Sequence, residues 1–160
     1  MEKNLKSKIG KLFLIVAVLI LFVTLFAGCK SRNQGSDAPE SHGFAIEENG
    51  TYSSKEEVAA YINEYGRLPE NFITKKEAKT LGWEGGSLEP FAKGKCIGGD
   101  VFGNFEGLLP EKPGRKYFEC DIDTLGASKR GAKRIIFSND GLIYYTDDHY
   151  DTFELLYGEE

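Results

Sequence analysis

A change of pattern near the middle of the chain most constrains its fold. Between residues 51 and 94 the apolar residues recur at helical spacing. From residue 95 onward, short apolar runs alternate with clusters of turn residues, a pattern that indicates strands. Asp140-Gly141 between two such runs predicts a hairpin. Helices followed by an antiparallel meander are typical of an α+β domain, with the helices packed on one face of the sheet.

The expected elements follow from their end signals. A serine or threonine three residues before a glutamate forms a capping box, and this spacing occurs at 54–57 and at 74–77. We expect helices from these points to stops at Gly66 and Gly82, and a short third helix over Leu88–Ala92. The strand-like runs are Lys95–Val101, Arg115–Ile122, Arg134–Ser138, Leu142–Thr146 and Phe153–Tyr157.

The N-terminal segment, residues 1–28, has the pattern of a signal peptide. Four lysines precede an apolar stretch from Leu12 to Phe26, which is shorter than the ~20 residues of a comfortable membrane span. The following Ala27-Gly28-Cys29 resembles a bacterial lipobox, in which the cysteine is diacylated, although Phe26 departs from the usual aliphatic residue. Ordinary cleavage and release is the alternative to lipidation at Cys29.

Two regions follow the signal peptide. Residues 29–50 are rich in small and polar residues and predict a flexible tether that begins at the lipidated cysteine. Residues 51–160 have the size of one compact domain, which we expect to be a monomer. The whole chain has a formal charge of −5, and loss of four lysines and one glutamate with residues 1–28 makes it −8. Any site for a polyanion must therefore be a local basic pocket.

One histidine, His149, lies in the domain, since the only other one, His42, precedes it. Without CxxC or HExxH motifs, the sequence predicts neither a protein-built metal site nor a cofactor. A lone histidine can still act as a proton donor if a carboxylate takes the opposite role. RNA suits such a pair because its 2′-hydroxyl is a nucleophile beside the phosphate.

Glu119 is the candidate carboxylate. In the strand Arg115–Ile122 alternation places Phe118, Cys120 and Ile122 toward the core and Glu119 on the opposite, open face. Three cations follow within fifteen residues: Arg130, Lys133 and Arg134. Arginines near a carboxylate and an imidazole indicate a phosphate-binding pocket. A surface ion-pair network would also explain the charges, but not the histidine.

Cys96 and Cys120 leave two alternatives open. They fall on neighbouring strands of a domain expected outside the cell, which favours a disulfide. Side-chain parity opposes it, because Cys96 should point outward if Ile97 and Val101 point into the core. A bulge at Gly98-Gly99 would lie too late to realign Cys96.

The domain resembles the secreted guanyl-preferring ribonucleases of bacteria, the barnase and binase family. The resemblance runs from about Val58 to Phe153 with little gapping. It is carried by the order and spacing of several segments: 68–75 (LPENFITK), 81–83 (LGW), 97–102 (IGGDVF), Glu106-Gly107 with Leu109-Pro110, Glu119 with Asp121-Ile122, Arg134-Ile135, 142–144 (LIY), 148–150 (DHY) and 152–153 (TF). It implies that family's α+β fold and endoribonuclease activity.

The resemblance also implies roles for single residues. Glu119 matches the general base for the ribose 2′-hydroxyl, and His149 the general acid for the departing 5′-oxygen. The cations that hold the phosphate match Lys75, Arg130 and Arg134. Because the loop before Arg134 is one residue longer here, Lys129 is an alternative to Arg130.

Guanine recognition in the family uses loop backbone groups and a glutamate, which fall on 103–107, with Gly103 and Asn104, and on Glu106. Phe102 and Tyr150 match aromatic positions beside the base and the active site. Two departures remove positive charge: Phe105 stands where the family types have arginine, and Leu108 where they have lysine. We therefore expect weaker affinity for RNA and for barstar, the family's acidic inhibitor.

The leading hypothesis is a metal-independent endoribonuclease that cleaves single-stranded RNA 3′ of guanosine through a 2′,3′-cyclic phosphate. It would act outside the cell, secreted or anchored by lipid to the outer face of the membrane. The alternative is a surface lipoprotein that binds nucleotides or a partner protein without catalysis. An opposed acid and base favour the enzyme, because a binding protein has no need of them.

Overall fold

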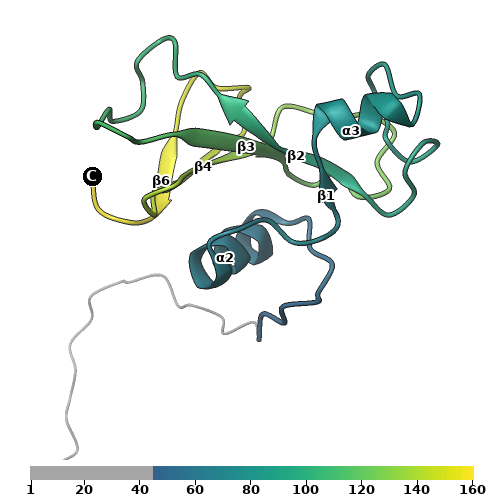
Figure 1. The fold of residues 1–160 in the computed structure, drawn as a ribbon, viewed down its shortest axis with the longest axis horizontal. Coiled ribbons are helices and arrows are strands. Elements are labelled where there is room, and N and C mark those ends of the chain that lie inside the picture. The colour runs from purple at the N-terminus through teal and green to yellow at the C-terminus, as the bar shows by residue number, and fades with distance from the viewer. Residues whose placement is uncertain (1–44) are drawn as a thin grey trace, which may run out of the picture. The chain divides into compact units, whose positions relative to one another are not determined.

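The structure, a computed structural model, describes residues 45–160. They form an α+β domain in which two helices accompany a six-stranded sheet with the order β1-β2-β3-β4-β5-β6 (Figure 1). The first pair of strands is parallel and the other four pairs are antiparallel. The strands are β1 (Phe72–Ile73), β2 (Cys96–Phe102), β3 (Tyr117–Asp121), β4 (Arg134–Ser138), β5 (Ile143–Thr146) and β6 (Glu154–Tyr157).

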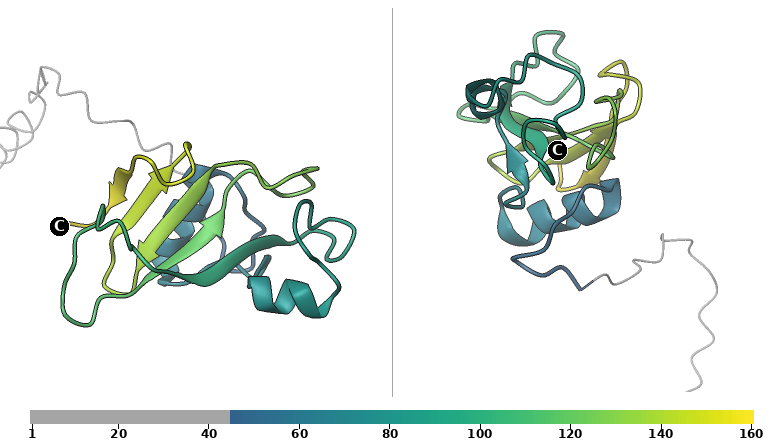
Figure 2. Two further views of the ribbon diagram at one scale, coloured as in Figure 1. Left: turned by 90° about the horizontal axis from the view of Figure 1, so that it is seen from above. Right: turned by 90° about the vertical axis from the view of Figure 1, so that its right-hand side faces the viewer.

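Helix α2 (Lys55–Tyr65) lies on one face of the sheet (Figures 1 and 2). Its start is fixed by the Ser54 hydroxyl, which accepts a hydrogen bond from the Glu57 backbone N–H. Its end is fixed by Gly66, whose φ of 66° closes the last turn. Val58 and Ile62 are buried against the sheet, and each such side chain contributes ~1.5–3 kcal/mol to stability.

Helix α3 (Lys75–Thr80) contacts β2 near the β1 end of the sheet (Figure 1). Its capping box is complete, because Thr74 and Glu77 each accept from the other's backbone N–H. The box confirms the predicted start of the helix and fixes Lys75 as its first residue. Only six residues are helical, and the buried one, Ala78, packs in a small cluster with Trp83.

The other predicted elements are confirmed with one exception, and one strand was not predicted. The five expected strands are present with ends shifted by at most two residues, and β4 and β5 form the predicted hairpin. The prediction of a third helix over Leu88–Ala92 is wrong. Residues 88–92 form a single turn, in which the N–H groups of Phe91 and Ala92 both donate to the Leu88 carbonyl. Strand β1 was missed because it has only two residues, and its pairing depends on β2, more than 20 residues later.

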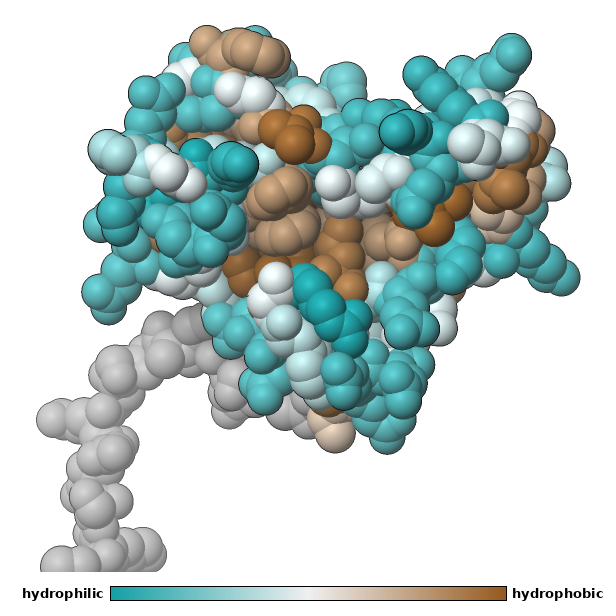
Figure 3. Space-filling model, in the orientation of Figure 1, coloured by the Kyte–Doolittle hydropathy of each residue, from teal (hydrophilic) through white to brown (hydrophobic). Residues whose placement is uncertain are grey.

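The two faces of the sheet carry different cores. The main core lies between α2 and the sheet and includes Ile122, Ile135 and Ile143. A second cluster on the opposite face joins Tyr117, Ile136, Leu142, Tyr144 and Leu109. Apolar surface is visible in the hollow between α2 and the sheet (Figure 3), where the margin of the main core reaches solvent. The opposite face is the one that carries Glu119.

The parity argument about the cysteines was wrong at its premise, because Ile97 does not share the main core with Cys96 and a bulge separates Ile97 from Val101. The register with β3 shifts between Gly98 and Asp100, and Gly99 has a φ of 92°. Cys96 is buried in the main core together with Cys120, whereas Ile97 points into a separate small cluster with Trp83. Both cysteines are free thiols. Of the two alternatives, the structure has two buried structural thiols and no disulfide between them.

The predicted signal peptide, Cys29 and most of the tether lie outside the described residues. Within residues 45–160, no helix is long and apolar enough to cross a membrane.

Candidate active site

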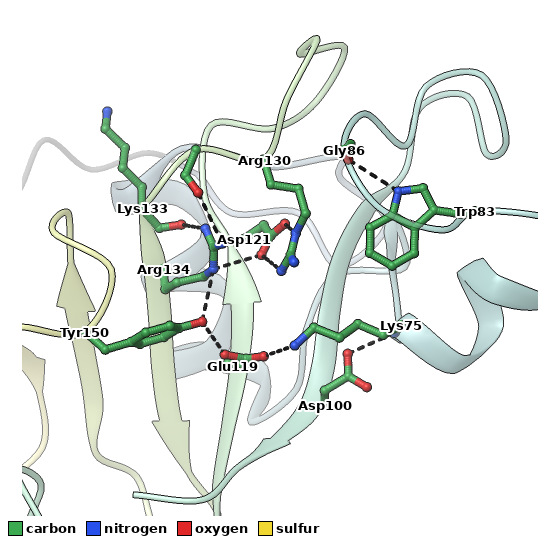
Figure 4. Close-up of polar contacts among 11 residues, drawn as sticks. Lys75, Trp83, Gly86, Asp100, Glu119, Asp121, Arg130, Lys133, Arg134 and Tyr150 are labelled. Carbon is green, nitrogen blue, oxygen red and sulfur yellow. Dashed lines mark hydrogen bonds and ion pairs between the residues drawn. The ribbon is translucent and has the colours of Figure 1, made fainter. Parts of the chain in front are cut away.

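Glu119 lies at the middle of β3, on the face opposite α2, and its side chain is largely enclosed. The residue is only 8% exposed, so the expectation of an open face was wrong. Its Oε2 accepts a hydrogen bond of 2.6 Å from the Tyr150 hydroxyl, and its Oε1 accepts one from the Lys75 ammonium group (Figure 4). A carboxylate has about four lone-pair sites, so Glu119 retains capacity to accept a proton from a ligand.

These contacts decide the pKa of Glu119. Burial is the largest single influence and raises the pKa, because it disfavours the charged form. The hydrogen bonds from Lys75 and Tyr150, together with the positive charges of Lys75 and Arg134, lower it. The lowering contributions win, and the pKa lies below the usual value for glutamate. Glu119 is therefore ionised at neutral pH, as a general base must be.

Two arginines meet at the buried carboxylate of Asp121. Arg130 forms a bidentate pair with it, Nε to Oδ2 at 2.6 Å and Nη2 to Oδ1 at 2.7 Å. Arg134 approaches from the other side, with Nε 3.1 Å from Oδ1 (Figure 4). The same Nε donates to the Tyr150 hydroxyl at 3.2 Å. Asp121 thus fixes both guanidinium groups and links them through Tyr150 to Glu119.

Lys75 is held from its backbone. Its N–H donates to the Asp100 carboxylate at 2.9 Å, so strand β2 fixes the start of α3 beside Glu119. The ammonium group then reaches across to Glu119 (Figure 4). Lys75 remains partly exposed, with 37% of its side chain accessible. The Lys75 ammonium group can therefore contact both the Glu119 carboxylate and a ligand in the cavity.

His149 and Tyr150 come from the loop between β5 and β6 in a conformation unusual for residues with side chains. Their φ angles are 64° and 81°, and such positions persist only where the surroundings hold them. The Asp148 carboxylate accepts from the backbone N–H groups of Asp151 and Thr152, both at 3.0 Å. The resulting loop exposes His149, whose ring lies 4.9 Å from the ring of Tyr150.

One cavity of about 350 Å³ brings the predicted residues together. Arg130 lines it and also a small neighbouring cavity, whereas Lys129 lines only the small one, so geometry favours Arg130 for the phosphate. The predicted residues on its wall are Lys75, Phe102, Gly103, Asn104, Glu106, Glu119, Arg130, Arg134, His149 and Tyr150, and Val101 and Phe105 complete it. We call this the active-site cavity. Every residue predicted to act in catalysis or substrate binding therefore lies on its wall, apart from the alternative Lys129.

Residues 103–106 of the loop 103–109 form part of the wall of the active-site cavity. The Asn104 side-chain amide donates to the Leu109 carbonyl at 2.9 Å and accepts from its N–H at 3.0 Å. These two bonds close the loop and leave Glu106 exposed at its tip. A carboxylate beside a fixed loop can read the donor edge of a base.

Sequence reasoning missed the supporting carboxylates. Alternation placed Asp121 on the same face as Glu119, but nothing in the pattern indicated that it pairs with both arginines. Asp100 could be found only from the contact between β2 and α3. The surface ion-pair alternative was wrong in one respect, since Asp121 and Arg134 are only 1% and 2% exposed.

No three His, Cys, Asp or Glu side chains within residues 45–160 form a group that could hold a metal ion.

The cavity combines a buried carboxylate, an exposed imidazole and three cations, an arrangement suited to acid–base chemistry on a phosphate ester. The family model for ribonuclease matches residues 55–157, and the chain belongs to that ribonuclease family. A ribonuclease of Heyndrickxia coagulans is 51% identical over 98 residues, which cover 60% of this chain and 89% of that protein.

A ribonuclease of Bacillus intermedius is also 51% identical over 98 residues, which cover 60% of each chain. Guanyl-specific ribonuclease St of Saccharopolyspora erythraea is 40% identical over 57 residues, which cover 36% of this chain and 56% of that protein. The matched part of the chain thus spans less than two thirds of these two relatives. The expected α+β ribonuclease fold and the ribonuclease assignment are confirmed.

Proposed function

We propose that the chain is a metal-independent endoribonuclease that cleaves single-stranded RNA on the 3′ side of guanosine. One observation carries the proposal: a buried, ionised Glu119 and an exposed His149 share a cavity lined by three cations. The opposed acid and base meet the needs of a substrate that carries its own nucleophile.

In the first step Glu119 takes the proton of the ribose 2′-hydroxyl, and the 2′-oxygen attacks the adjacent phosphorus. The bond from phosphorus to the 5′-oxygen breaks, and His149 protonates that oxygen as it leaves. The product is a 2′,3′-cyclic phosphate. In the second step the roles reverse: His149 takes a proton from water, whose oxygen attacks phosphorus. The bond from phosphorus to the 2′-oxygen breaks, and Glu119 protonates that oxygen, which leaves a 3′-phosphate. Because the nucleophile is intramolecular, the substrate itself supplies proximity.

Lys75, Arg130 and Arg134 stabilise the charge that develops on the phosphate oxygens. Arg130 uses two donors for Asp121 and keeps others for the phosphate, because a guanidinium has five N–H groups. Fixed donors of this kind act without reorganisation during the reaction. Asp121 therefore acts as a positioning residue for the cations rather than as a catalytic one.

Guanine would be read by the loop 103–107. The Glu106 carboxylate can accept from N1–H and the exocyclic amine of guanine, and adenine lacks both donors on that edge. Phe102 offers an apolar surface for the base, and its ring lies 5.4 Å from that of Tyr150. The guanyl-specific relative supports this preference.

The test of the catalytic pair uses GpA, ApA and UpA with EDTA present. Glu119→Gln and His149→Gln should each reduce GpA cleavage by ~10²-fold or more, while circular dichroism stays unchanged. EDTA should have no effect. Activity within tenfold of wild type in both variants, or dependence on added metal, would contradict the proposal.

A separate test concerns the base. Loss of a charged hydrogen-bond partner costs ~1.5–3 kcal/mol, so Glu106→Ala should reduce the preference for GpA over ApA about tenfold or more. Glu111→Ala is a matched control, since Glu111 is exposed and lines a different cavity. An unchanged ratio in Glu106→Ala would exclude this role.

The remaining proposals concern location and partners. We propose that residues 51–160 form a monomeric domain that acts outside the cell, tethered through 29–50 to a lipid on Cys29 after removal of 1–28. If so, Cys29→Ala should move the protein from the detergent phase into the medium, because two acyl chains give stable attachment. A barstar-like acidic inhibitor would bind the active-site cavity, with affinity reduced by the missing charges at Phe105 and Leu108.

A further inference from the structure

Phe105 stands out on the wall of the active-site cavity because it is 94% exposed. Single exposed apolar residues are common on protein surfaces. Here, however, Val101, which is 71% exposed, lines the same cavity. An acidic chain thus presents an aromatic ring and an aliphatic side chain to the place where its substrate binds.

The backbone that carries Phe105 is fixed from both sides. Asn104 has a φ of 45° and bonds to Leu109 through both ends of its side-chain amide. Gly107, with a φ of 65°, donates its N–H to the Asn104 carbonyl at 3.0 Å. The loop is therefore closed by contacts of its own, and none of them requires Phe105 to be buried.

The ring of Phe105 also has a defined position. It lies against Gly103 so closely that a Cβ at that glycine would fall 2.3 Å from Cε2 of the ring. Only glycine at position 103 allows this placement. The ring is therefore pre-positioned at the cavity wall while most of its surface stays in water.

We propose that Phe105 is a stacking platform for the base of the nucleotide next to the target guanosine. Single-stranded RNA offers unstacked bases, and aromatic side chains bind them by their faces. Glu106 and Phe102 are already assigned to the guanine itself, so the base on Phe105 is a flanking one. This inference rests on the proposed function, and it extends substrate recognition from one nucleotide to two.

At position 105 the uncharged aromatic ring is suited to stacking on a base, whereas a contact to an RNA phosphate would need a positive charge. Phe105 supplies no positive charge, so its contribution should depend little on salt, unlike contacts to phosphates. A purine should gain more than a pyrimidine because its face is larger. Phe105 would thus bind RNA through van der Waals contact with a base instead of through electrostatic attraction to a phosphate.

The experiment measures kcat/KM of the full chain on trinucleotides that keep the phosphate and vary only the outer base. In ApGpA the adenosine on the 5′ side of guanosine and the adenosine on its 3′ side are replaced in turn by an abasic ribose, and GpA is the core substrate. Stacking on an aromatic ring is worth ~1–3 kcal/mol per base, so adenine should be favoured over the abasic sugar roughly fivefold or more on one side of guanosine.

Three variants test the role of the ring. Phe105→Leu keeps an apolar side chain without a π-face and should lower the ratio of adenine to abasic substrate to about one. Phe105→Trp should restore or increase it. Leu108→Ala is the matched control, since Leu108 is 55% exposed on the same loop but does not line the cavity, and its ratio should equal that of wild type.

Each outcome decides the proposal. A ratio near one in wild type on both sides of guanosine overturns it, as does an equal ratio in wild type and Phe105→Leu. A ratio that collapses between 0.05 and 0.5 M salt also overturns it, because that would indicate a charge contact. Failure of wild type to cleave GpA would instead overturn the proposed function, so the two failures are distinguishable.

Discussion

At the scale of residues, Asp121 has the largest structural role in the site. It holds two guanidinium groups, and its own side chain is 2% exposed. A carboxylate in this position compensates the desolvation of both arginines. Its influence on catalysis is therefore indirect, through the placement of Arg130 and Arg134 and through the link from Arg134 to Tyr150.

We expect Asp121→Asn to destabilise the domain strongly, because it leaves two largely buried cations without a full counter-charge. Breaking a buried pair in this way costs ~3–5 kcal/mol, which should lower Tm by more than about 10 °C. Asp123→Asn is the control, since the pair of Asp123 with Lys133 is about half exposed on both sides and is worth ~0–1 kcal/mol. Equal Tm values for the two variants, measured by thermal unfolding, would contradict this role.

Lys75 should control the pH dependence of catalysis. The base form of Glu119 exists above its pKa, which the hydrogen bond from Lys75 helps to lower. Lys75→Met removes this bond and its charge and leaves burial, which raises the pKa. The acidic limb of the profile of kcat/KM against pH should therefore move to higher pH, in addition to a lower maximum rate.

Tyr150→Phe removes the other hydrogen bond to Glu119 and should move the acidic limb in the same direction. Lys76→Met, at an exposed neighbouring position of α3, should leave the limb in place. An acidic limb that stays fixed or moves to lower pH in Lys75→Met would show that Lys75 does not set the pKa of Glu119.

At the scale of elements, the sequence predicted features that depend on neighbouring residues better than features that depend on contacts between distant segments. The two helix starts and the Asp140-Gly141 hairpin involve residues close in sequence, and all three are present. The capping box is complete only at Thr74 and Glu77, because at the other start the Glu57 carboxylate accepts from the Ser54 hydroxyl. The side-chain parity of β3 correctly placed Glu119 away from the main core. The parity argument for β2 failed because Ile97 points into the cluster with Trp83, and the bulge at Gly99 prevents Ile97 and Val101 from serving as residues of one face.

The loop between β5 and β6 shows why the site could be predicted only in part. The sequence predicted roles for His149 and Tyr150, but not the backbone conformation that presents them. Hydrogen bonds to Asp148 from the hydroxyls of Thr146 and Thr152, at 2.7 and 2.6 Å, complete its contacts. These contacts hold the pKa of Asp148 at about 2, so the loop keeps its anchor across the neutral and mildly acidic range.

Asp148→Ala should therefore reduce RNA cleavage without removing any group that touches the substrate. Misplacement of a catalytic group by about 1 Å can lower the rate ~10²-fold, so we expect a loss of roughly tenfold to a hundredfold in kcat. Asp147→Ala changes an exposed neighbour and serves as the control. Equal kcat values for both variants would contradict a positioning role for Asp148.

At the scale of the whole molecule, an acidic chain places three cations, Lys75, Arg130 and Arg134, on the wall of one cavity. The net charge of −5 opposes long-range attraction of RNA, and the surface near the guanine loop adds Phe105 and Leu108 in place of cations. Affinity must therefore come from short-range contacts within the cavity. This arrangement predicts a weak response to salt.

We expect log(kcat/KM) on single-stranded RNA to fall with log[NaCl] with a slope no steeper than about −2. Each phosphate contact to a single strand contributes about −0.7, and the cavity offers three cations, of which two are already paired with Asp121. Lys75→Met should make the slope shallower by ~0.7. Lys116→Gln, which lines a different cavity, should leave it unchanged. A slope steeper than about −4 between 0.05 and 0.5 M NaCl would mean that RNA contacts cations well beyond the active-site cavity.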